Sequence, residues 1–164
     1  MKGIEKQLIN AYDELADALF RHCYFRVGDR EKAKDLLQET FAKTWQYLAE
    51  GGKIDNLRAF LYRVATNLII DLFRKKRPEI SLEDLKERGF EIGSNADKKL
   101  RNEVAGKEAL LFLRKLKPEY REVIIMRYID DLSLKEIAEI LNDTENNVSV
   151  RIHRGLKQIR ELLN

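Results

Sequence analysis

The last twenty residues carry the side chains best suited to act on another molecule. Read as a helix, they place Asn147, Val150, Arg151 and Arg154 on one face. Asparagine and arginine hydrogen-bond to base edges, and arginine also attracts phosphates. Such groups near the start of a helix suit its entry into the major groove of DNA. The predicted chemistry is therefore binding without bond making, and the alternative is a solvated face in a plain helical hairpin.

A second concentration of positive charge precedes the first proline, Pro78. Residues 58–77 hold six basic side chains and one acidic one, although the chain of 164 residues has a net charge of only +3. Local concentration of charge, rather than the total, indicates polyanion binding. The alternative is a ladder of surface ion pairs along a helix. The positive balance favours contact with nucleic acid.

Neither catalysis nor a metal site is predicted. Asp35 and Glu39 are four residues apart, a spacing found in carboxylate metal sites, but no histidine lies at a suitable offset. His22 adjoins the single cysteine, Cys23, and a zinc site needs more ligands than this pair. The chain has no phosphate-binding loop and no nucleophile elbow. We therefore expect no enzyme activity, no metal and no cofactor.

The basic stretch at 58–77 requires a helical bundle to position it. Apolar residues recur three or four apart in three segments of residues 1–77, which are separated by Gly28-Asp29 and Gly51-Gly52. Asp29 can cap the second helix, and the third helix ends before Pro78. The predicted apolar stripes are Ile4, Leu8, Tyr12, Leu15, Leu19 and Cys23; Ala33, Leu37, Phe41, Trp45 and Leu48; and Leu57, Leu61, Val64, Leu68 and Leu72.

The C-terminal part predicts a helix-turn-helix. Pro118 suits the first turn of a helix that precedes it. Ser133 and Glu136 can form a capping box, Asn142 tolerates left-handed backbone angles in the turn, and Thr144 can cap the second helix. The predicted apolar face of that helix comprises Val148, Ile152, Leu156, Ile159 and Leu163.

Residues 78–99 separate these two parts. They lose the helical periodicity and contain two glycines and many charges. We therefore predict an all-α fold of two small helical domains, residues 1–77 and 100–164, joined by a flexible linker. The C-terminal domain is the helix-turn-helix.

Length and composition exclude several classes of protein. The longest apolar run is five residues, 109–113, too short to cross a membrane. The N-terminus does not resemble a signal peptide. A single cysteine excludes an internal disulfide framework and fits a reducing cytosol. We expect a cytoplasmic protein without membrane insertion.

Two separate blocks of the sequence resemble the bacterial extracytoplasmic-function (ECF) sigma factors, group IV of the sigma-70 superfamily. The segments DLLQETFAKTW at 35–45 and LRAFLYRVATN at 57–67 are similar to the family's region two. Residues 113–128, 132–141 and 148–154 are similar to its region four. The order and spacing match over nearly the whole chain. The resemblance implies a subunit that gives RNA polymerase its promoter specificity.

The resemblance also implies partners and roles for individual residues. Region two would bind core RNA polymerase and the non-template strand of the minus-ten element, with residues 51–56 as the loop that holds a flipped base. Region four would bind the minus-thirty-five element as duplex DNA. Many members of the family are held inactive by an anti-sigma factor, which is a further candidate partner. The residues implied are Asp35, Gln38, Glu39 and Trp45 for polymerase; Lys53, Asn56, Asn67, Asp71, Arg74 and Lys75 for the minus-ten element; and Lys135, Asn147, Val150, Arg151 and Arg154 for the minus-thirty-five element.

Some positions depart from the family pattern or allow another interpretation. Asn142-Asp143 stands in the turn where the family usually has a glycine. Gly155, where alanine is common, weakens a helix by up to about 1 kcal/mol unless close packing requires it. Trp45 lies on an apolar stripe, so core packing is its expected role, and the polymerase contact is the family-based alternative. For the whole chain, the alternatives are an autonomous dimeric helix-turn-helix regulator and a polymerase-binding adaptor that does not read DNA.

Overall fold

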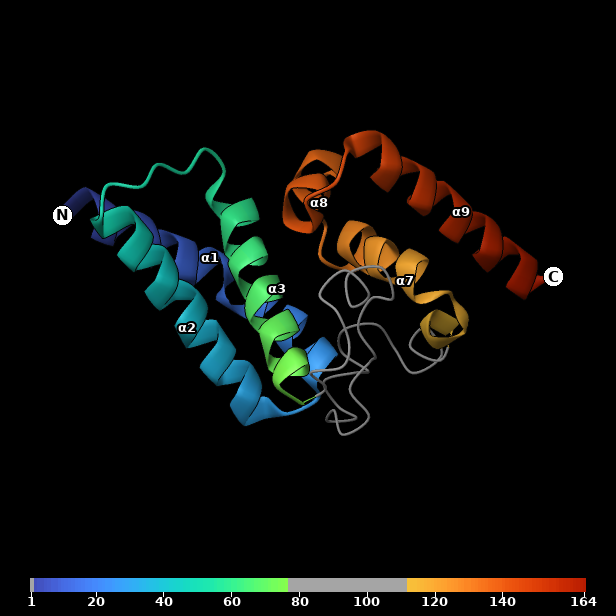
Figure 1. Ribbon diagram of the computed structural model, residues 1–164, viewed down its shortest axis with the longest axis horizontal. Coiled ribbons are helices and arrows are strands. Elements are labelled where there is room, and N and C mark those ends of the chain that lie inside the picture. The colour runs from blue at the N-terminus through green and yellow to red at the C-terminus, as the bar shows by residue number, and fades with distance from the viewer. Residues whose placement is uncertain (1, 77–111) are drawn as a thin grey trace.

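The computed structural model describes residues 2–76 and 112–164. These residues form seven helices and no strand, which confirms the predicted all-α class. Three helices make the N-terminal half and four make the C-terminal half, and the halves lie side by side (Figure 1). The predicted linker, 78–99, and the start of the predicted second domain, 100–111, lie outside the described residues.

The N-terminal half is a bundle of three long helices, as predicted. α1 spans Lys2–Val27, α2 spans Arg30–Ala49 and α3 spans Leu57–Lys76. Asp29 caps α2, because its carboxylate accepts the N–H of Lys32 at 3.0 Å. This hydrogen bond satisfies one of the donors that the start of a helix leaves without a partner.

The packed face of α2 is rotated from the predicted stripe. Thr40 and Thr44 are fully buried, whereas Phe41 and Trp45 are only half-buried. The two threonine hydroxyls donate to the backbone carbonyl oxygens four residues earlier, at 2.7 and 2.8 Å. A hydroxyl with such a partner can be buried without leaving an unsatisfied polar group. Apolar spacing alone could not show this.

Two residues that were predicted on apolar faces are exposed. Tyr12 is 48% exposed, and its ring packs edge-on against Phe41 with 5.1 Å between the centroids. Leu163 is 68% exposed because it is the last residue of its helix, where the helix reaches the edge of the molecule (Figure 1). The helical periodicity was right at both places, but the neighbouring elements do not cover these positions.

The C-terminal half contains the helix-turn-helix. α7 spans Pro118–Ile124 and continues as one π-helical turn, η1, over Ile125–Ile129. α8 spans Leu134–Leu141, and α9 spans Glu145–Leu163 along the outer side of the molecule (Figure 1). Pro118 is at the first position of α7, as predicted. α9 packs against α7 and α8.

The predicted caps of the helix-turn-helix are confirmed. Ser133 Oγ accepts the N–H of Glu136 at 3.1 Å, and the Glu136 carboxylate accepts the N–H of Ser133 at 3.0 Å. Asn142 ends α8 in the left-handed region with φ 54°. Thr144 caps α9 by accepting the N–H of Asn147 at 3.1 Å. The start and direction of α9 are therefore fixed by local hydrogen bonds.

Close packing explains the glycine within α9. A Cβ at Gly155 would lie 3.0 Å from Cγ1 of Ile124 and 3.2 Å from Cβ of Tyr120. These distances are tighter than ordinary van der Waals contact. Gly155 thus lets the axis of α9 approach α7 closely, in return for its lower helix propensity.

Buried charges join the two halves. Arg26 of α1 donates from Nε to the Glu122 carboxylate of α7 at 3.0 Å, and its Nη2 contacts the same oxygen. Nη2 also lies 3.6 Å from Oδ2 of Asp130. The three side chains are 2%, 4% and 5% exposed. A guanidinium that is buried in this way is strongly destabilising without its carboxylate partners. The ion pairs therefore favour this pairing of the two halves.

His22 of α1 extends this cluster in its neutral form. Its Nδ1 lies 3.1 Å from Oδ2 of Asp130, and its Nε2 lies 3.1 Å from the hydroxyl of Thr66. A carboxylate only accepts, so Nδ1 carries the proton and Nε2 accepts from Thr66. Burial first, and then the positive charge of Arg26, lowers the pKa of His22, although Asp130 and Glu122 oppose this shift. Burial also raises the pKa of the neighbouring Cys23 thiol to about 12.

The edge of this interface reaches the start of α3. Arg58 donates to the backbone carbonyls of Asp130, at 3.3 Å, and Asp131. Asn56 donates its side-chain amide to Glu136 of α8 at 3.2 Å, and Arg58 Nε lies 3.8 Å from the same carboxylate oxygen. Burial would raise the pKa of Glu136, but the Ser133 N–H, Arg58 and Asn56 together lower it. Glu136 therefore caps its own helix and also contacts the other half.

Candidate nucleic-acid interface

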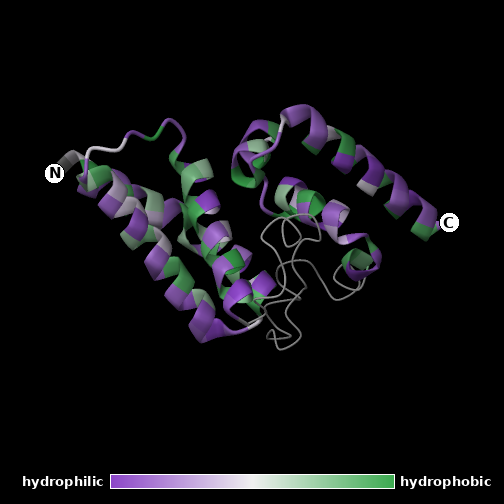
Figure 2. Ribbon diagram, in the orientation of Figure 1, coloured by the Kyte–Doolittle hydropathy of each residue, from purple (hydrophilic) through white to green (hydrophobic). Residues whose placement is uncertain are grey.

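The outward face of α9 carries the predicted base-contacting residues. Asn147 and Arg154 are exposed, Val150 is 38% exposed and Arg151 is half-buried. Val148 and Ile152 on the opposite face are buried in the core. Hydrophilic residues predominate along α9 (Figure 2). The sequence prediction that these side chains share one solvent-facing side of a capped helix is confirmed in its geometry.

Asp143, in the turn, organises this face. Its Oδ1 accepts the N–H of Thr144 and the side-chain amide of Asn147, both at 2.8 Å. Its Oδ2 accepts from Nη2 of Arg151 at 2.8 Å. Burial would raise the pKa of Asp143, but the bonds from Asn147 and Thr144 and the charge of Arg151 lower it. One carboxylate thus holds the first two turns of α9.

The two arginines of α9 differ in their contacts. Arg151 is tied to Asp143, with 29% of its side chain exposed. Arg154, one turn further, is exposed and makes no side-chain hydrogen bond or ion pair to another described residue. Lys135 is exposed on α8 rather than on α9. Asp143 therefore joins Asn147 and Arg151, whereas Arg154, on the same face, is not tied to them, and Lys135 lies on a different helix.

The basic end of α3 presents a second polar surface. Asn67, Asp71, Arg74 and Lys75 are all exposed, and none has a hydrogen-bond or ion-pair partner among the described residues. Asp71, Arg74 and Lys75 line a groove of about 500 Å³ between α2 and α3, together with Glu39 and Lys43. The alternative of an ion-pair ladder along α3 does not occur within 57–75. These side chains are available to a ligand.

The loop between α2 and α3 has a fixed shape. The Tyr47 hydroxyl donates to the carbonyl oxygen of Lys53 at 3.4 Å, and the Tyr47 ring lies 5.0 Å from that of Phe60. A Cβ at Gly52 would lie 2.4 Å from the Tyr47 ring, so any other residue would require that ring to move. Asn56 accepts the N–H of Ala59 at 3.0 Å and thereby caps α3. The loop is held by aromatic packing and by this cap.

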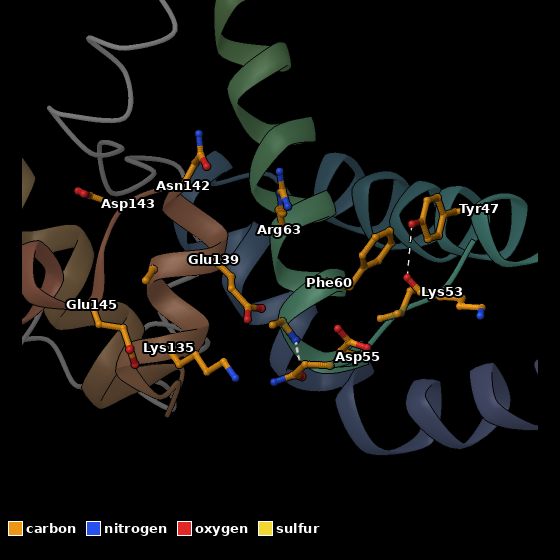
Figure 3. A pocket seen from close by; sticks show the side chains of 14 residues that line it. Tyr47, Lys53, Asp55, Phe60, Arg63, Lys135, Glu139, Asn142, Asp143 and Glu145 are labelled. Carbon is orange, nitrogen blue, oxygen red and sulfur yellow. Dashed lines mark hydrogen bonds between the residues drawn. The ribbon is translucent and has the colours of Figure 1, made fainter. Parts of the chain in front are cut away.

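A groove of about 610 Å³ lies between this loop and the helix-turn-helix (Figure 3). Lys53, Asp55, Phe60 and Arg63 line it from one half. Lys135, Glu139, Asn142, Asp143 and Glu145 line it from the other. The lining contains three basic and four acidic side chains. A polyanion gains little in such a mixed field, so the groove itself is a weaker candidate for nucleic-acid binding than the exposed faces of α9 and α3.

Known proteins identify the family of this chain. Residues 11–79 match the family model of sigma-70 region 2, and residues 107–159 match that of sigma-70 region 4. The ECF RNA polymerase sigma factor SigW of Bacillus subtilis is 34% identical over 172 residues, which cover 99% of this chain and 91% of SigW. The chain belongs to the ECF RNA polymerase sigma factors.

Other sigma factors are similar over most of their length. SigM of Bacillus subtilis is 29% identical, with 93% of each chain covered. CnrH, solved in complex with the cytosolic domain of CnrY, has a TM-score of 0.65 at 23% identity, covering 97% of this chain and 88% of CnrH. RpoE from Bartonella quintana, solved with the anti-sigma factor NepR, has a TM-score of 0.66 at 21% identity, covering 99% and 98%. These two likenesses show that the fold is shared.

An ECF sigma factor binds core RNA polymerase and directs promoter-specific initiation of transcription. In this sigma factor, the predicted polymerase-binding residues all lie on α2. Asp35, Gln38 and Glu39 are exposed, whereas Trp45 is half-buried. The first three therefore form a polar surface that a protein partner can reach, and Trp45 lies between that surface and the core.

Sequence reasoning about this sigma factor missed two groups of residues. Asp143 was noted only as a departure from the family, although its spacing of four and eight from Asn147 and Arg151 was visible. His22 was considered only as a metal ligand, and Arg26 gave no signal, because their partners in the C-terminal half are about a hundred positions away.

Within the described residues, no three His, Cys, Asp or Glu side chains gather to hold a metal. None of the described helices is long and apolar enough to span a membrane.

Proposed function

We propose that α9 of this sigma factor reads the minus-thirty-five element as duplex DNA, and that α3 and the loop before it hold the minus-ten strand. The observation that supports this proposal is the exposed face of α9. Asn147 lies on that face just after the helix cap, and Arg151 and Arg154 lie one and two helical turns further along. The corresponding domains are residues 1–77 and 100–164, with 78–99 as the linker.

At the minus-thirty-five element, the two arginines have different roles. Arg151 is held by Asp143 close to the start of α9, which suits directed hydrogen bonds to a base edge. Arg154 has no partner among the described residues and suits the less directional attraction of a phosphate. Val150 offers an apolar contact for a thymine methyl group, and Lys135 on α8 adds a phosphate contact.

At the minus-ten element, the binding surface consists of adaptable side chains. Arg74 and Lys75 attract the strand, and Asn67 and Asp71 on the same helix supply hydrogen-bonding groups. Lys53 belongs to the loop that Tyr47 holds in shape. Asn56 donates one amide proton to Glu136 and has a second proton for a base.

Polymerase binding is assigned to α2. Asp35, Gln38 and Glu39 are exposed there, and Trp45 is half-buried beside them. Polymerase performs the chemistry, so the chain itself is not an enzyme, and it acts in the cytoplasm with the polymerase. An anti-sigma factor is a further partner by analogy with RpoE, whose structure contains NepR.

Reconstitution with core polymerase tests the proposal against the two alternatives. Transcription from a genomic template should begin at a defined set of promoters only when the chain and core polymerase are both present. Starts without selectivity would support a polymerase-binding adaptor. Tight operator binding by a homodimer of the free chain, at physiological salt, would support an autonomous regulator. The few basic residues of α9 predict only weak DNA binding by the free chain.

A double substitution tests the polymerase surface separately. Gln38→Ala with Glu39→Ala should weaken co-purification with core polymerase and leave folding intact, because both side chains are exposed. The matched control is Asp13→Ala with Glu14→Ala, an exposed pair on α1. Equal retention of polymerase by the two double variants would refute the assignment to α2.

A further inference from the structure

Asp143 stands at a place where a negative charge is costly for a DNA-binding surface. It precedes the capping residue of α9 and lies beside two side chains that we propose contact bases. A carboxylate there repels the phosphates that Arg151 and Arg154 attract. The contacts of Asp143 indicate what compensates for this repulsion.

The backbone of Asp143 is fixed from the side of α8. Its N–H donates to the carbonyl of Ala138 at 2.9 Å, while the N–H of Asn142 reaches the carbonyl of Glu139 at 3.4 Å. With Asn142 in the left-handed region, these bonds form a Schellman motif. The carboxylate therefore extends from a rigid turn rather than from a mobile loop.

The side chain of Asp143 fixes α9 from the other side. Its Oδ1 takes one amide proton of Asn147, which directs Nδ2 toward the turn and leaves the carbonyl oxygen and the second proton of that amide for other partners. Its Oδ2 takes one proton of Arg151 Nη2 and leaves the other guanidinium donors for other partners. Both side chains lose rotamer freedom before any DNA arrives, which lowers the cost of ordering them on binding.

We propose that Asp143 is a specificity-determining residue, which positions Asn147 and Arg151 for base recognition. Its negative charge at the same time lowers the affinity for DNA of any sequence. This inference rests on the proposed function of α9. It assigns Asp143 no base contact of its own. Specificity and affinity should then change in opposite directions when its charge is removed.

Asp143→Asn is the informative variant. Asparagine keeps the size and one carbonyl acceptor for Thr144 and Asn147, but it loses the charge that holds Arg151. The matched control is Glu145→Gln, which removes a charge two residues away at an exposed position with no side-chain hydrogen bond or ion pair to a described residue. Thermal unfolding of both variants checks that the fold is kept.

The measurement is transcription by the reconstituted holoenzyme from templates randomised across the upstream element. Asp143→Asn should lower the base preference at one or two positions by about two- to five-fold, the range expected for losing a partly exposed ion pair. Output averaged over all sequences should hold or rise. Glu145→Gln should raise the average output without changing the preference. Unchanged preference in Asp143→Asn, or equal flattening in the control, overturns the inference.

Two further variants separate this inference from the proposed function. If Arg151→Ala changes the base preference and Asp143→Asn does not, α9 reads DNA and only the role of Asp143 is wrong. If Arg151→Ala also leaves the preference unchanged, the assignment of α9 fails, and the inference fails with it. In a combined Asn147→Ala and Arg151→Ala background, Asp143→Asn should have no further effect on preference. A further effect there would show direct contact between Asp143 and a base, which also contradicts a positioning role.

Discussion

Charged side chains are arranged in opposite ways between the two halves and on the face of α9. Between the halves, Arg26, Glu122 and Asp130 are covered from water, and each charge faces an opposite one. On α9, Arg154 is exposed and has no described partner, while Arg151 is held by one half-buried carboxylate. Both regions are polar, yet only the second leaves donors for a ligand.

The difference shows that burial decides what a charge contributes. A buried guanidinium has no water to replace a lost partner, so removing the partner costs several kcal/mol of stability. An exposed guanidinium exchanges its partner for water at little cost, so its loss is felt mainly by the ligand. We therefore expect substitutions between the halves to change stability, and substitutions on α9 to change DNA binding.

The largest effect is expected for Glu122→Ala. This substitution leaves the Arg26 guanidinium buried beside Asp130 alone and should cost the closed arrangement of the halves about 3–5 kcal/mol. Arg26 regains water if the halves separate, so the radius of gyration from small-angle X-ray scattering should rise. Glu161→Ala, at an exposed acid of α9, should leave it unchanged. An unaltered scattering curve for Glu122→Ala would mean that the buried pair does not hold the halves together.

A smaller effect, on specificity alone, is expected for Arg151→Ala. A directed arginine contact to a guanine contributes about 1–3 kcal/mol of discrimination. The variant should flatten the preference at one or two upstream positions in transcription by the holoenzyme. Its urea unfolding should stay close to wild type, because Arg151 is half-buried and its ion pair is only partly covered. A large loss of stability would contradict the expectation that this side chain of α9 acts on DNA binding and not on folding.

The pH dependence of unfolding tests the buried region independently. The pKa of His22 is lower in the folded protein than its ordinary value of 6.5, so the unfolded chain binds more protons below that pH. The contribution of neutral His22 to the free energy of unfolding should therefore be fully present above about pH 6.5. Below that pH it should fall, by up to about 1.4 kcal/mol per pH unit. Urea unfolding between about pH 8 and pH 5 measures this.

Substitution of each histidine identifies the source of that slope. His22→Gln should remove most of it, since glutamine can still donate to Asp130 and accept from Thr66. His153→Gln, at the only other histidine, should keep it because His153 is exposed. The lowered pKa values of Glu136 and Asp143 act at more acidic pH and do not overlap with this window. A slope that survives in His22→Gln would exclude His22 as its cause.

The smallest effect is expected for Arg154→Ala. One lost phosphate contact should reduce the slope of log affinity against log salt by about one and weaken all promoter variants to a similar degree. Binding of the holoenzyme to promoter DNA over a range of salt concentrations measures this slope. A change in base preference instead would show that Arg154, like Arg151, contacts a base.

Local features of this fold were predictable, whereas contacts between distant segments were not. The caps at Asp29, Ser133 and Thr144 follow from residues within three positions of each other, so the sequence shows them directly. The pair Arg26–Glu122 spans 96 positions and looks like two ordinary surface charges. For the candidate site, helical spacing placed Asn147 and Arg151 on one face. Spacing could not show that Asp143 joins them, because an acid in a turn commonly bonds to its own backbone.

The hydrogen bond between Asn56 and Glu136 couples the two halves in the proposed promoter-binding site. If the minus-ten strand takes the amide proton that Asn56 donates to Glu136, it breaks a contact with the other half, 80 positions away in the chain. Linkage is reciprocal, so any ligand that draws the halves apart would then tighten strand binding by the factor with which the strand draws them apart. An upstream contact at α9 that separates the halves would thus lower the free energy of capturing the downstream strand without any contact between α9 and that strand.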